Sequence, residues 1–526
     1  MKAKAKKVVK AICFCLVVVL MVNFLTDLFK PKFLENRWKF TKTINSFYDL
    51  DEDSIEVALL GTSQMAASMD PLQLYEEQGI SSFNLGIMSQ PIQATYFWLR
   101  EVVKSQDLKL AVVEVKAMAR KGLKEDVKAR RSFDYMKDNL NKLQYAKEYH
   151  NSLEDESKFG LKKKLLPFYW DYLFPLDVYH SRWSSLEYDD YDFLFGDNNR
   201  TNTRGFATLT TEFQNNKNYD EKKDEKGKYD GLVIKTDEVE DVHESIAEYD
   251  ITFIEYAKEQ GIPLLFIKTP DVTWNEKQHN YIKMLAEKYD IEFIDFNLKE
   301  MHEEIGFDLL TDEADTIHTN ISGAQKITKY VGDYISANYD VTDYRESDSD
   351  VKEVIESELD DYHDTMRNAN LSFEYDFYEY AELLDNEDYD ILVVAGSNTI
   401  DLENMSDEQK DVFLKLGVKK DAFKETEDGV NVAVANINGE IESKADKQDE
   451  ERTKSSYIGG SFRDGTDYAI TAADKCCAVR INNNKQVLIN EGALNVIVYD
   501  NKLHEIADTA YIYNSDVWLM IDRKEL

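Results

Sequence analysis

The chain has 526 residues, enough for two or three domains, and its 101 acidic and 63 basic residues give a formal net charge of −38 at pH 7. A chain with this charge repels the phosphate backbone of DNA and RNA, which argues against nucleic acid as a partner. The four cysteines form neither a disulfide framework nor a spaced set of metal ligands, so we expect no metal and no cofactor.

The N-terminus is rich in lysine and leads into an apolar run from Ala11 to Leu25. The run is just long enough to span a bilayer, and the lysines before it are expected to stay in the cytoplasm. No small-x-small cleavage site follows, which favours an uncleaved signal anchor over a removed signal peptide; a buried core helix is the alternative. We therefore expect residues 1–30 to be a single-pass anchor in the cell membrane, with the rest of the chain outside the cytoplasm.

Residues 31–340 show an α/β pattern, in which apolar runs alternate with amphipathic helical segments. Alternation of this kind is typical of a parallel sheet covered by helices. The predicted strands are Ile55–Leu60, Ser82–Leu85, Leu110–Val115, Pro263–Lys268 and Ile291–Asp295. The predicted helices are Pro71–Gln78, Ala94–Lys104, Tyr249–Gln260, Glu276–Tyr289 and Ile321–Ala337.

Between about residues 120 and 241 this rhythm stops, and the insertion is helical, charged and aromatic, as lids and substrate walls often are. Residues 341–385 are strongly acidic and are interpreted as a linker with a surface helix. A second apolar rhythm over residues 386–526 predicts a separate α/β domain. Its predicted elements are the helix Ser406–Leu416 and the strands Tyr389–Ala395, Val430–Ile437, Ala478–Ile481, Leu494–Tyr499 and Trp518–Ile521.

Ser63, Asp315 and His318 have the residue types of a serine nucleophile with its base. A hydroxyl needs a base to accept its proton, and the imidazole needs a carboxylate to hold its tautomer. Ser63 follows the first predicted strand, as a nucleophile at a strand–helix turn does, and Asp315 lies three residues before His318. Helix capping is the alternative role for Ser63 and His318, and Asp312 is a rival to Asp315.

The order Ser63, Asp315, His318 resembles the SGNH/GDSL hydrolase superfamily over about residues 30–340, and in particular its membrane-anchored bacterial members related to the D-alanyl-transfer protein of the teichoic-acid system. The segments that carry this resemblance are 61–63, 83–90, 179–183 and 311–324. The resemblance implies a three-layer α/β/α domain with a parallel sheet and catalysis by Ser63, Asp315 and His318.

The chain departs from that family after the third strand, because residues 112–118 lack the Asn that helps to bind the oxyanion. The backbone N–H groups of Ser63 and Ser89 remain as candidate donors, since an oxyanion hole needs donors and not particular side chains. Asn84, Gly86 and Gln90 are candidates to line the site, although a tight turn is an equally good role for Gly86.

His180 and Arg182 form a polar cluster with the neighbouring Trp183. The guanidinium suits an anionic group of a sugar or polymer phosphate at the cleft. Structural anchoring of the insertion is the alternative and carries equal weight.

Residues 386–524 resemble the interleukin-like EMT inducer module (ILEI, or PANDER type). The matching segments are 389–394, 413–417, 432–439 and 492–500. This resemblance implies a noncatalytic role, with carbohydrate as the candidate ligand.

Together these features predict a membrane-anchored extracytoplasmic serine acyltransferase, which moves an acyl group such as acetyl onto a surface polysaccharide or teichoic-acid-like polymer. A membrane-bound O-acyltransferase is the candidate partner that delivers the acyl group. Two alternatives stay open. One is an esterase that removes such groups, and the other is a noncatalytic glycan-binding scaffold whose triad has decayed.

Overall fold

The computed structural model describes residues 2–33, 37–122, 126–152, 170–196, 199–213, 231–396, 406–420, 430–447, 455–473, 476–482, 485–487, 489–514 and 519–523. The chain divides into two compact units, Met1–Leu359 and Asp360–Leu526. Each unit has its own hydrophobic core, so each has the packing of a domain.

A five-stranded parallel sheet forms the centre of the first unit, with the strand order β2-β1-β3-β4-β5. The strands are β1 (Val57–Thr62), β2 (Ser82–Ile87), β3 (Leu110–Glu114), β4 (Leu264–Lys268) and β5 (Glu292–Asp295). Every residue of β1 to β4 is buried, which explains why their sequences are mostly apolar rather than alternating. The sheet confirms the α/β fold predicted from the pattern of apolar runs.

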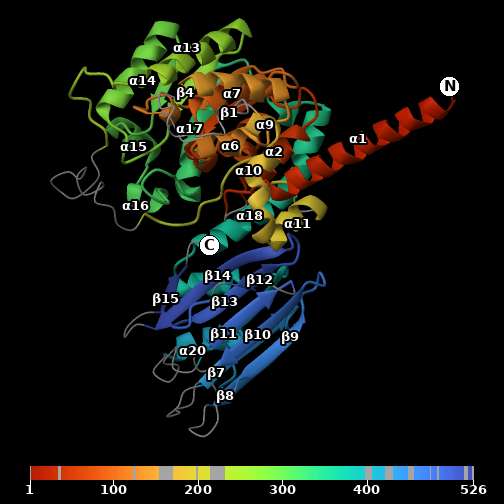
Figure 1. The fold of residues 1–526 in the computed structure, drawn as a ribbon. Coiled ribbons are helices and arrows are strands. Elements are labelled where there is room, and N and C mark those ends of the chain that lie inside the picture. The colour runs from red at the N-terminus through yellow and green to blue at the C-terminus, as the bar shows by residue number, and fades with distance from the viewer. Residues whose placement is uncertain are drawn as a thin grey trace. The chain divides into compact units, whose positions relative to one another are not determined.

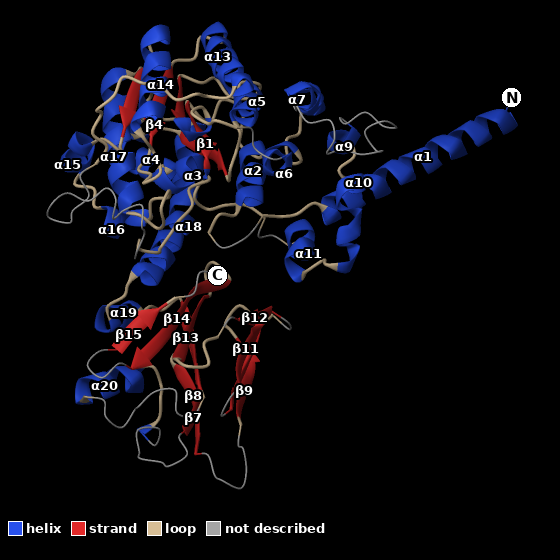
Figure 2. Ribbon diagram, turned by 60° about the vertical axis from the view of Figure 1, so that its left-hand side comes forward, coloured by secondary structure: helices blue, strands red, loops and turns tan. Residues whose placement is uncertain are grey.

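Helices cover both faces of this sheet, as Figures 1 and 2 show. Alternate residues of β1 point to opposite faces: Ala58 and Leu60 belong to one core cluster, and Val57 and Leu59 belong to another. The first cluster contains residues of α2 (Phe40–Tyr48), α5 (Ile92–Val102), α13 (Glu244–Glu259) and α14 (Glu276–Tyr289). The second contains residues of α4 (Pro71–Gln78) and α17 (Ile321–Asn338). The first unit is therefore a three-layer domain.

Shorter elements connect these layers and form the insertion. Around the sheet they are α3 (Ser63–Ser68), η1 (Val115–Ala117), α15 (Lys299–Ile305), α16 (Leu309–Asp312) and η4 (Tyr344–Glu346). In the insertion they are α6 (Asp126–Phe133), α7 (Asn139–Ser152), α9 (Trp170–Leu173), α10 (Leu176–Tyr179), η3 (His180–Ser184) and α11 (Tyr188–Phe195). The described residues 126–152 and 170–196 of the insertion are mostly helical, as the sequence predicts, whereas residues 199–213 and 231–241 contain no helix.

The N-terminal helix α1 (Lys2–Phe29) is the longest helix of the described chain. Its segment Lys6–Phe29, 24 residues long, has the length and the apolar composition needed to cross a membrane. A retained signal anchor and a removed signal peptide both have these properties. Helix α18 (Asp350–Phe373) lies in the acidic stretch of the sequence and runs across the boundary between the two units.

Two antiparallel sheets form the second unit. The six-stranded sheet has the order β15-β14-β13-β6-β7-β8 and consists of β6 (Tyr389–Ala395), β7 (Val430–Ile437), β8 (Glu440–Lys447), β13 (Leu494–Asp500), β14 (Glu505–Asn514) and β15 (Leu519–Asp522). The four-stranded sheet has the order β12-β11-β10-β9 and consists of β9 (Ser456–Ser461), β10 (Asp467–Ala473), β11 (Cys476–Ile481) and β12 (Lys485–Val487).

The two faces of β6 show how this second unit is packed. Leu392 and Val394 lie in one core cluster with Ile470 of the four-stranded sheet. Val393 lies in the other cluster, which includes residues of α19 (Phe377–Leu383) and α20 (Asp407–Lys415). The six-stranded sheet is therefore covered by a second sheet on one face and by helices on the other.

Candidate active site

Ser63 follows the carboxyl end of β1 directly and is the first residue of α3. In the sheet, β2 and β3 lie on opposite sides of β1. The chain therefore runs from β1 to β2 on one side and then crosses from β2 to β3 on the other side, so the strand order reverses at β1. A point of this kind, at the carboxyl ends of parallel strands, is where open α/β sheets bind their ligands. The topology thus gives Ser63 the position at which a reactive residue is expected.

The structure brings Ser63, His318 and Asp315 together in one chain of hydrogen bonds. Ser63 Oγ lies 2.8 Å from His318 Nε2, although the two residues are 255 positions apart in the sequence. His318 Nδ1 lies 2.8 Å from Asp315 Oδ2. In this arrangement an imidazole is able to take the proton of a hydroxyl while a carboxylate holds its tautomer.

The carboxylate of Asp315 is held in place by its own loop. Its Oδ1 accepts the backbone N–H groups of Ile317 at 2.8 Å and His318 at 3.0 Å. Burial opposes ionisation, but the hydrogen bonds from His318 and from these N–H groups outweigh it, so the pKa of Asp315 lies below its usual value. Asp315 is therefore ionised at neutral pH, as a partner of the imidazole should be.

Trp38 is a member of this site that the sequence gives no reason to select. Its ring meets the imidazole of His318 edge-on, with 4.9 Å between the ring centroids. The His318 side chain is 11% exposed, whereas that of Asp315 is 48% exposed. The aromatic contact helps to keep water from the imidazole and fixes the orientation of its ring.

Asp312, the rival carboxylate, has a different set of partners. Its side chain is fully buried, pairs with Lys326 Nζ at 2.6 Å and accepts the Ser322 hydroxyl at 2.7 Å. It also accepts the backbone N–H of Asp308 at 2.7 Å. These contacts tie the loop before α17 to that helix, so the geometry favours Asp315 as the partner of His318.

A polar seam joins the segment that contains His318 to α3, the helix that begins at Ser63. Thr319, next to His318, donates its hydroxyl to the carbonyl of Ala67 at 2.8 Å, and its Oγ1 lies 2.9 Å from Ser68 Oγ. The backbone N–H of Asp70 donates to Thr328 Oγ1 of α17 at 3.0 Å. Because these groups are buried and paired, the seam fixes the distance between Ser63 and His318.

Asn84 and Gly86 support α3 instead of facing a substrate. Asn84 is fully buried, and its amide donates to the carbonyls of Met65 at 2.9 Å and Met69 at 2.8 Å. Its Oδ1 accepts the N–H of Gly86 at 2.9 Å. Because the amide of Asn84 is committed to the backbone of α3 and β2, we assign it a positioning role.

Gly86 lies where β2 passes closest to the turn that contains Ser63. A Cβ atom at this position would come within 2.6 Å of both Ala66 N and Thr62 O. Close backbone packing therefore explains the glycine at this position.

We expect Gly86→Ala to lower the rate of Ser63 acylation by about 10- to 100-fold, because the methyl group pushes α3 away from β2 and a displacement of about 1 Å is enough to misalign a nucleophile. The rate is to be measured with an activated acetyl ester, and circular dichroism checks that the chain stays folded. Gly122→Ala is the matched control, since a Cβ there meets no atom within 4 Å. Equal rates for the two variants would contradict the role given to Gly86.

Ser89 lies in the turn that follows β2, with φ at +58°. The N–H of Gln90 donates to the carbonyl of Ile87 at 3.0 Å, which closes the turn. The buried side chain of Gln90 donates to the carbonyl of Gly61 at 2.9 Å and accepts the hydroxyl of Ser132 at 2.8 Å. Gln90 thus holds the Ser89 turn against the end of β1, close to Ser63.

Arg182 is anchored at the C-terminal end of α1, and His180 lies in the same short helix, η3. Arg182 donates to the carbonyl of Phe29 at 2.8 Å and forms a two-pronged pair with Asp190 at 3.0 and 2.9 Å. His180 is exposed, and its Nδ1 lies 2.7 Å from the carbonyl of Asp177. The contacts of Arg182 favour structural anchoring over the sugar contact.

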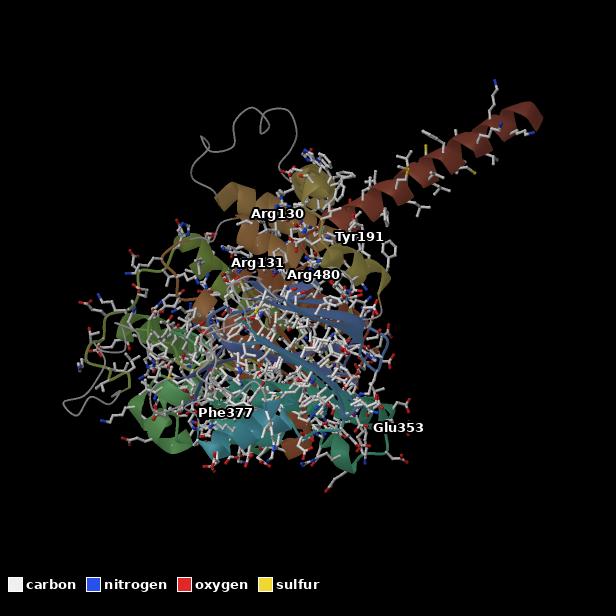
Figure 3. The ribbon with its side chains drawn as sticks, turned by 90° about the horizontal axis from the view of Figure 1, so that it is seen from below. Arg130, Arg131, Tyr191, Glu353, Phe377 and Arg480 are labelled. Carbon is white, nitrogen blue, oxygen red and sulfur yellow. The ribbon has the colours of Figure 1, made fainter. Side chains whose placement is uncertain are left out.

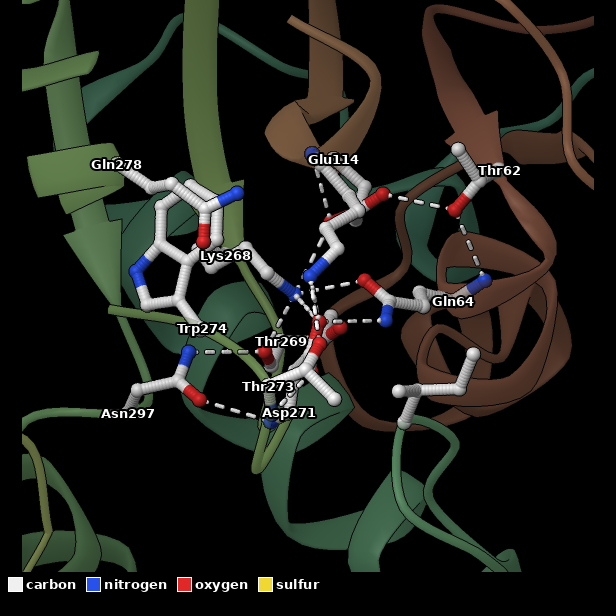
Figure 4. Close-up of polar contacts among 12 residues, drawn as sticks. Thr62, Gln64, Glu114, Lys268, Thr269, Asp271, Thr273, Trp274, Gln278 and Asn297 are labelled. Atoms are coloured by element: carbon white, nitrogen blue, oxygen red, sulfur yellow. Dashed lines mark hydrogen bonds and ion pairs between the residues drawn. The ribbon is translucent and has the colours of Figure 1, made fainter. Parts of the chain in front are cut away.

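A buried network of charges, drawn in Figure 4, lies beside Ser63. Lys268, at the end of β4, donates to Gln64 Oε1 at 2.6 Å and pairs with Glu114 Oε1 at 3.2 Å. Gln64 Nε2 donates to Asp271 Oδ2 at 2.9 Å, and Lys116 Nζ pairs with the same oxygen at 2.6 Å. The side chains of Lys268, Glu114 and Asp271 are fully buried, so each charge is stabilised by the opposite charges beside it.

This network holds both neighbours of Ser63. Thr62 donates its hydroxyl to Glu114 Oε2 at 2.9 Å and accepts the N–H of Gln64 at 3.2 Å, which caps α3. Burial opposes the ionisation of Asp271, but Lys268 and Lys116 hold the pKa of its carboxyl well below the usual range. The network therefore holds the two residues on either side of Ser63 in fixed positions.

A cavity of about 470 Å³ adjoins this network. Lys116 of the network contributes to its lining, together with Thr273, Arg120, Lys121 and Glu240, whereas Ser63 does not. Lys121 pairs with Glu240 at 3.0 Å. The cavity is therefore a polar neighbour of the site and does not contain the triad.

Glu313 is a fully buried carboxyl group, and in the described part of the chain neither of its oxygens has a hydrogen-bond partner. Burial, followed by the nearby charges of Asp271 and Asp315, raises the pKa of Glu313 well above its usual value. The folded chain therefore holds the proton of Glu313 to a higher pH than the unfolded chain does.

We expect Glu313→Gln to be more stable than the wild type at neutral pH, by a margin that grows with pH. The unfolded chain releases this proton above about pH 4.3, whereas the folded chain keeps it. The free energy of unfolding of the wild type therefore falls by about 1.4 kcal/mol per pH unit above that pH, until the raised pKa is reached. Glutamine never ionises and avoids this loss. Unfolding of the first unit by urea at about pH 5 and pH 7 measures the margin, and an equal margin at both values would contradict the assignment.

Among the described residues, no group of three or more His, Cys, Asp or Glu side chains is arranged to hold a metal ion. Comparison of the chain with protein-family models and with curated proteins finds no match.

Proposed function

We propose that the first unit is a serine acyltransferase of the SGNH type, held at the outer side of a cell membrane by α1. The observation that carries this proposal is the pair of 2.8 Å contacts from Ser63 Oγ to His318 Nε2 and from His318 Nδ1 to Asp315 Oδ2. The parallel sheet of order β2-β1-β3-β4-β5 supports it, because it is compatible with the three-layer domain that the resemblance of residues 30–340 implies.

The proposed reaction has two steps. In the first, Ser63 Oγ attacks the carbonyl carbon of the acyl donor while His318 takes the hydroxyl proton. The bond to the leaving group of the donor then breaks, and His318 returns the proton to that group. In the second step, an acceptor hydroxyl gives its proton to His318 and attacks the ester on Ser63, which regains its proton as the acyl group leaves.

Backbone N–H groups are the proposed donors to the oxyanion. The segment after β3 contributes Lys116, which is engaged by Asp271, and residues 112–118 contain no Asn. The turn with Ser89 lies against the end of β1 and adjoins the start of α3. The N–H groups of Ser63 and Ser89 are therefore the donors that we favour.

The proposed acceptor is a hydroxyl of a surface polysaccharide or a teichoic-acid-like polymer, and the acyl group is one such as acetyl. A membrane-bound O-acyltransferase is the proposed source of the acyl group, since a domain tethered by α1 would meet a donor delivered across the bilayer. The second unit, through its resemblance to ILEI-type modules, is proposed to bind glycan without catalysis.

Mass spectrometry of the full chain in detergent, after exposure to p-nitrophenyl acetate, tests this proposal. We expect one acetyl group on Ser63 of the wild type and none on this residue in Ser63→Ala or His318→Ala. Ser245→Ala, on α13, is the matched serine control and should be labelled like the wild type. An unlabelled wild type would overturn the proposal and favour the noncatalytic scaffold.

The fate of the acetyl group separates transfer from hydrolysis. Loss of the label to an added glycan, with the acetyl recovered on the glycan, supports an acyltransferase. Loss at the same rate in buffer alone supports the esterase, in which water replaces the sugar hydroxyl as acceptor.

A further inference from the structure

A group of short helices packs against the C-terminal half of α1. These helices are α10, η3 and α11, and each of them contacts α1. Figure 3 shows Tyr191 of α11 beside the C-terminal end of α1. We propose that this group, which with its flanking residues spans residues 174–196 and is called here the interfacial segment, lies in the headgroup region of the bilayer that α1 crosses.

The interfacial segment presents large aromatic side chains to solvent. Trp183 and Phe195 are each 71% exposed, Phe174 is 45% exposed and Tyr191 is 44% exposed. Aromatic side chains of this kind are enriched at the level of lipid headgroups, where an apolar ring and a polar edge are both accommodated. Exposure of such large apolar rings to water is unfavourable, so a lipid surface is the environment that suits them.

The position of Phe195 beside α1 indicates how deeply the segment lies in the bilayer. Its ring centroid lies 6.2 Å from that of Phe24. Phe24 comes five residues before Phe29, the last residue of α1, and each helical residue rises by about 1.5 Å. Phe195 is therefore roughly 7 to 8 Å inside the end of the apolar helix, which is the depth reached by interfacial helices, about 5 to 10 Å.

Polar contacts fix the segment to the end of α1. Arg182 donates to the carbonyl of Phe29 and is itself held by Asp190. Lys32, which is buried, donates to the carbonyl of Leu28 at 3.3 Å. Two cations thus cap the carbonyl end of the helix, and one of them, Arg182, joins the segment to it.

The charge of the segment identifies the kind of lipid surface. Asp177 and Glu187 are exposed and Asp192 is partly exposed, whereas Asp190 is buried and paired with Arg182, so the segment has little attraction for anionic headgroups. Burial of aromatic rings is therefore the driving force, and zwitterionic phosphatidylcholine is the appropriate probe. The inference rests on the anchoring role proposed for α1 and is independent of the proposed chemistry.

Quenching of tryptophan fluorescence by brominated lipid tests the inference. The full chain is reconstituted into phosphatidylcholine nanodiscs with bromine on the upper part of the acyl chains, and wild type is compared with Trp183→Phe. We expect a quenched component in the wild type that is lost in Trp183→Phe. Trp98→Phe is the matched control, because Trp98 is fully buried in the core and its removal should leave that component intact.

A second variant tests the depth. Phe195→Asp should reduce the quenching of Trp183, since a carboxylate beside Phe24 pulls the segment away from lipid. Equal quenched components in wild type and Trp183→Phe would overturn the inference. The reconstituted chain contains α1 whether or not a cell removes it, so this result would leave the anchor standing. Loss of α1 in cells would instead overturn the anchor and, with it, the lipid contact of the segment.

Discussion

Asp315→Asn should lower the rate of acyl transfer by about 10³- to 10⁴-fold while changing the stability of the first unit little. Asparagine keeps the shape of the side chain but removes the negative charge, and its amide favours the wrong tautomer of His318. The side chain of Asp315 is half-exposed, so the fold does not depend on its charge. Single-turnover labelling of Ser63 and the unfolding of the first unit by urea measure the two effects.

Asp312→Asn is the matched control and should show the opposite behaviour. Asp312 is buried and paired with Lys326 and Ser322, so the substitution should destabilise the first unit by about 1 to 3 kcal/mol. Its rate under conditions where it stays folded should be close to that of the wild type. If Asp312→Asn reduced the labelling rate as much as Asp315→Asn, our assignment of the carboxylate would be wrong.

Lys268→Met should destabilise the first unit by about 3 to 5 kcal/mol, because it leaves Glu114 and Asp271 as buried charges without their common cation. The substitution also removes the donor to Gln64, next to Ser63, so labelling of the remaining folded protein should slow. Calorimetry of the full chain should show a lower melting temperature for the first unit and an unchanged melting temperature for the second.

Lys329→Met provides the comparison for this large effect. Lys329 pairs with Asp333 at 3.1 Å, but its side chain is 61% exposed, and such surface pairs contribute about 0 to 1 kcal/mol. A melting transition of Lys268→Met as high as that of Lys329→Met would contradict the interdependence of the buried charges.

The parallel sheet of the first unit is predictable because its strands are buried on both faces. A continuous apolar run such as that of β3 indicates a buried strand. Helices α4 and α14 begin and end at the predicted residues. Helix α2 is missed, since its buried face includes Thr41, Lys42 and Thr43 and so carries a weak apolar signal.

The second unit shows where such patterns fail. The apolar strands β6 and β13 are found, but β8, β9, β10, β12 and β14 are not among the predicted strands. Strand β9 alternates buried and exposed positions and contains two glycines, and β8 is rich in charge. Antiparallel strands with one exposed face lack the continuous apolar run that marks a buried strand.

In the candidate site, sequence order and spacing select Ser63, Asp315 and His318, and the structure places them in contact; their catalytic role stays a prediction. Lys268 and Gln64 are not predictable in this way. They are 204 residues apart, and a charged or amide residue at the end of an apolar run is ordinarily a solvated one. Their role depends on long-range pairing, which has no local signal.

The distance along the chain between the two halves of the triad has a consequence for protein synthesis. Ser63 leaves the ribosome 255 residues ahead of His318, which at about 5 to 20 residues per second is roughly 10 to 50 s. Throughout that interval the nascent chain carries an ordinary alcohol with no base to activate it. Under the proposed mechanism, a product of premature termination before residue 315 lacks Asp315 and His318 and stays unreactive toward acyl donors, so the serine becomes reactive only when the domain is complete.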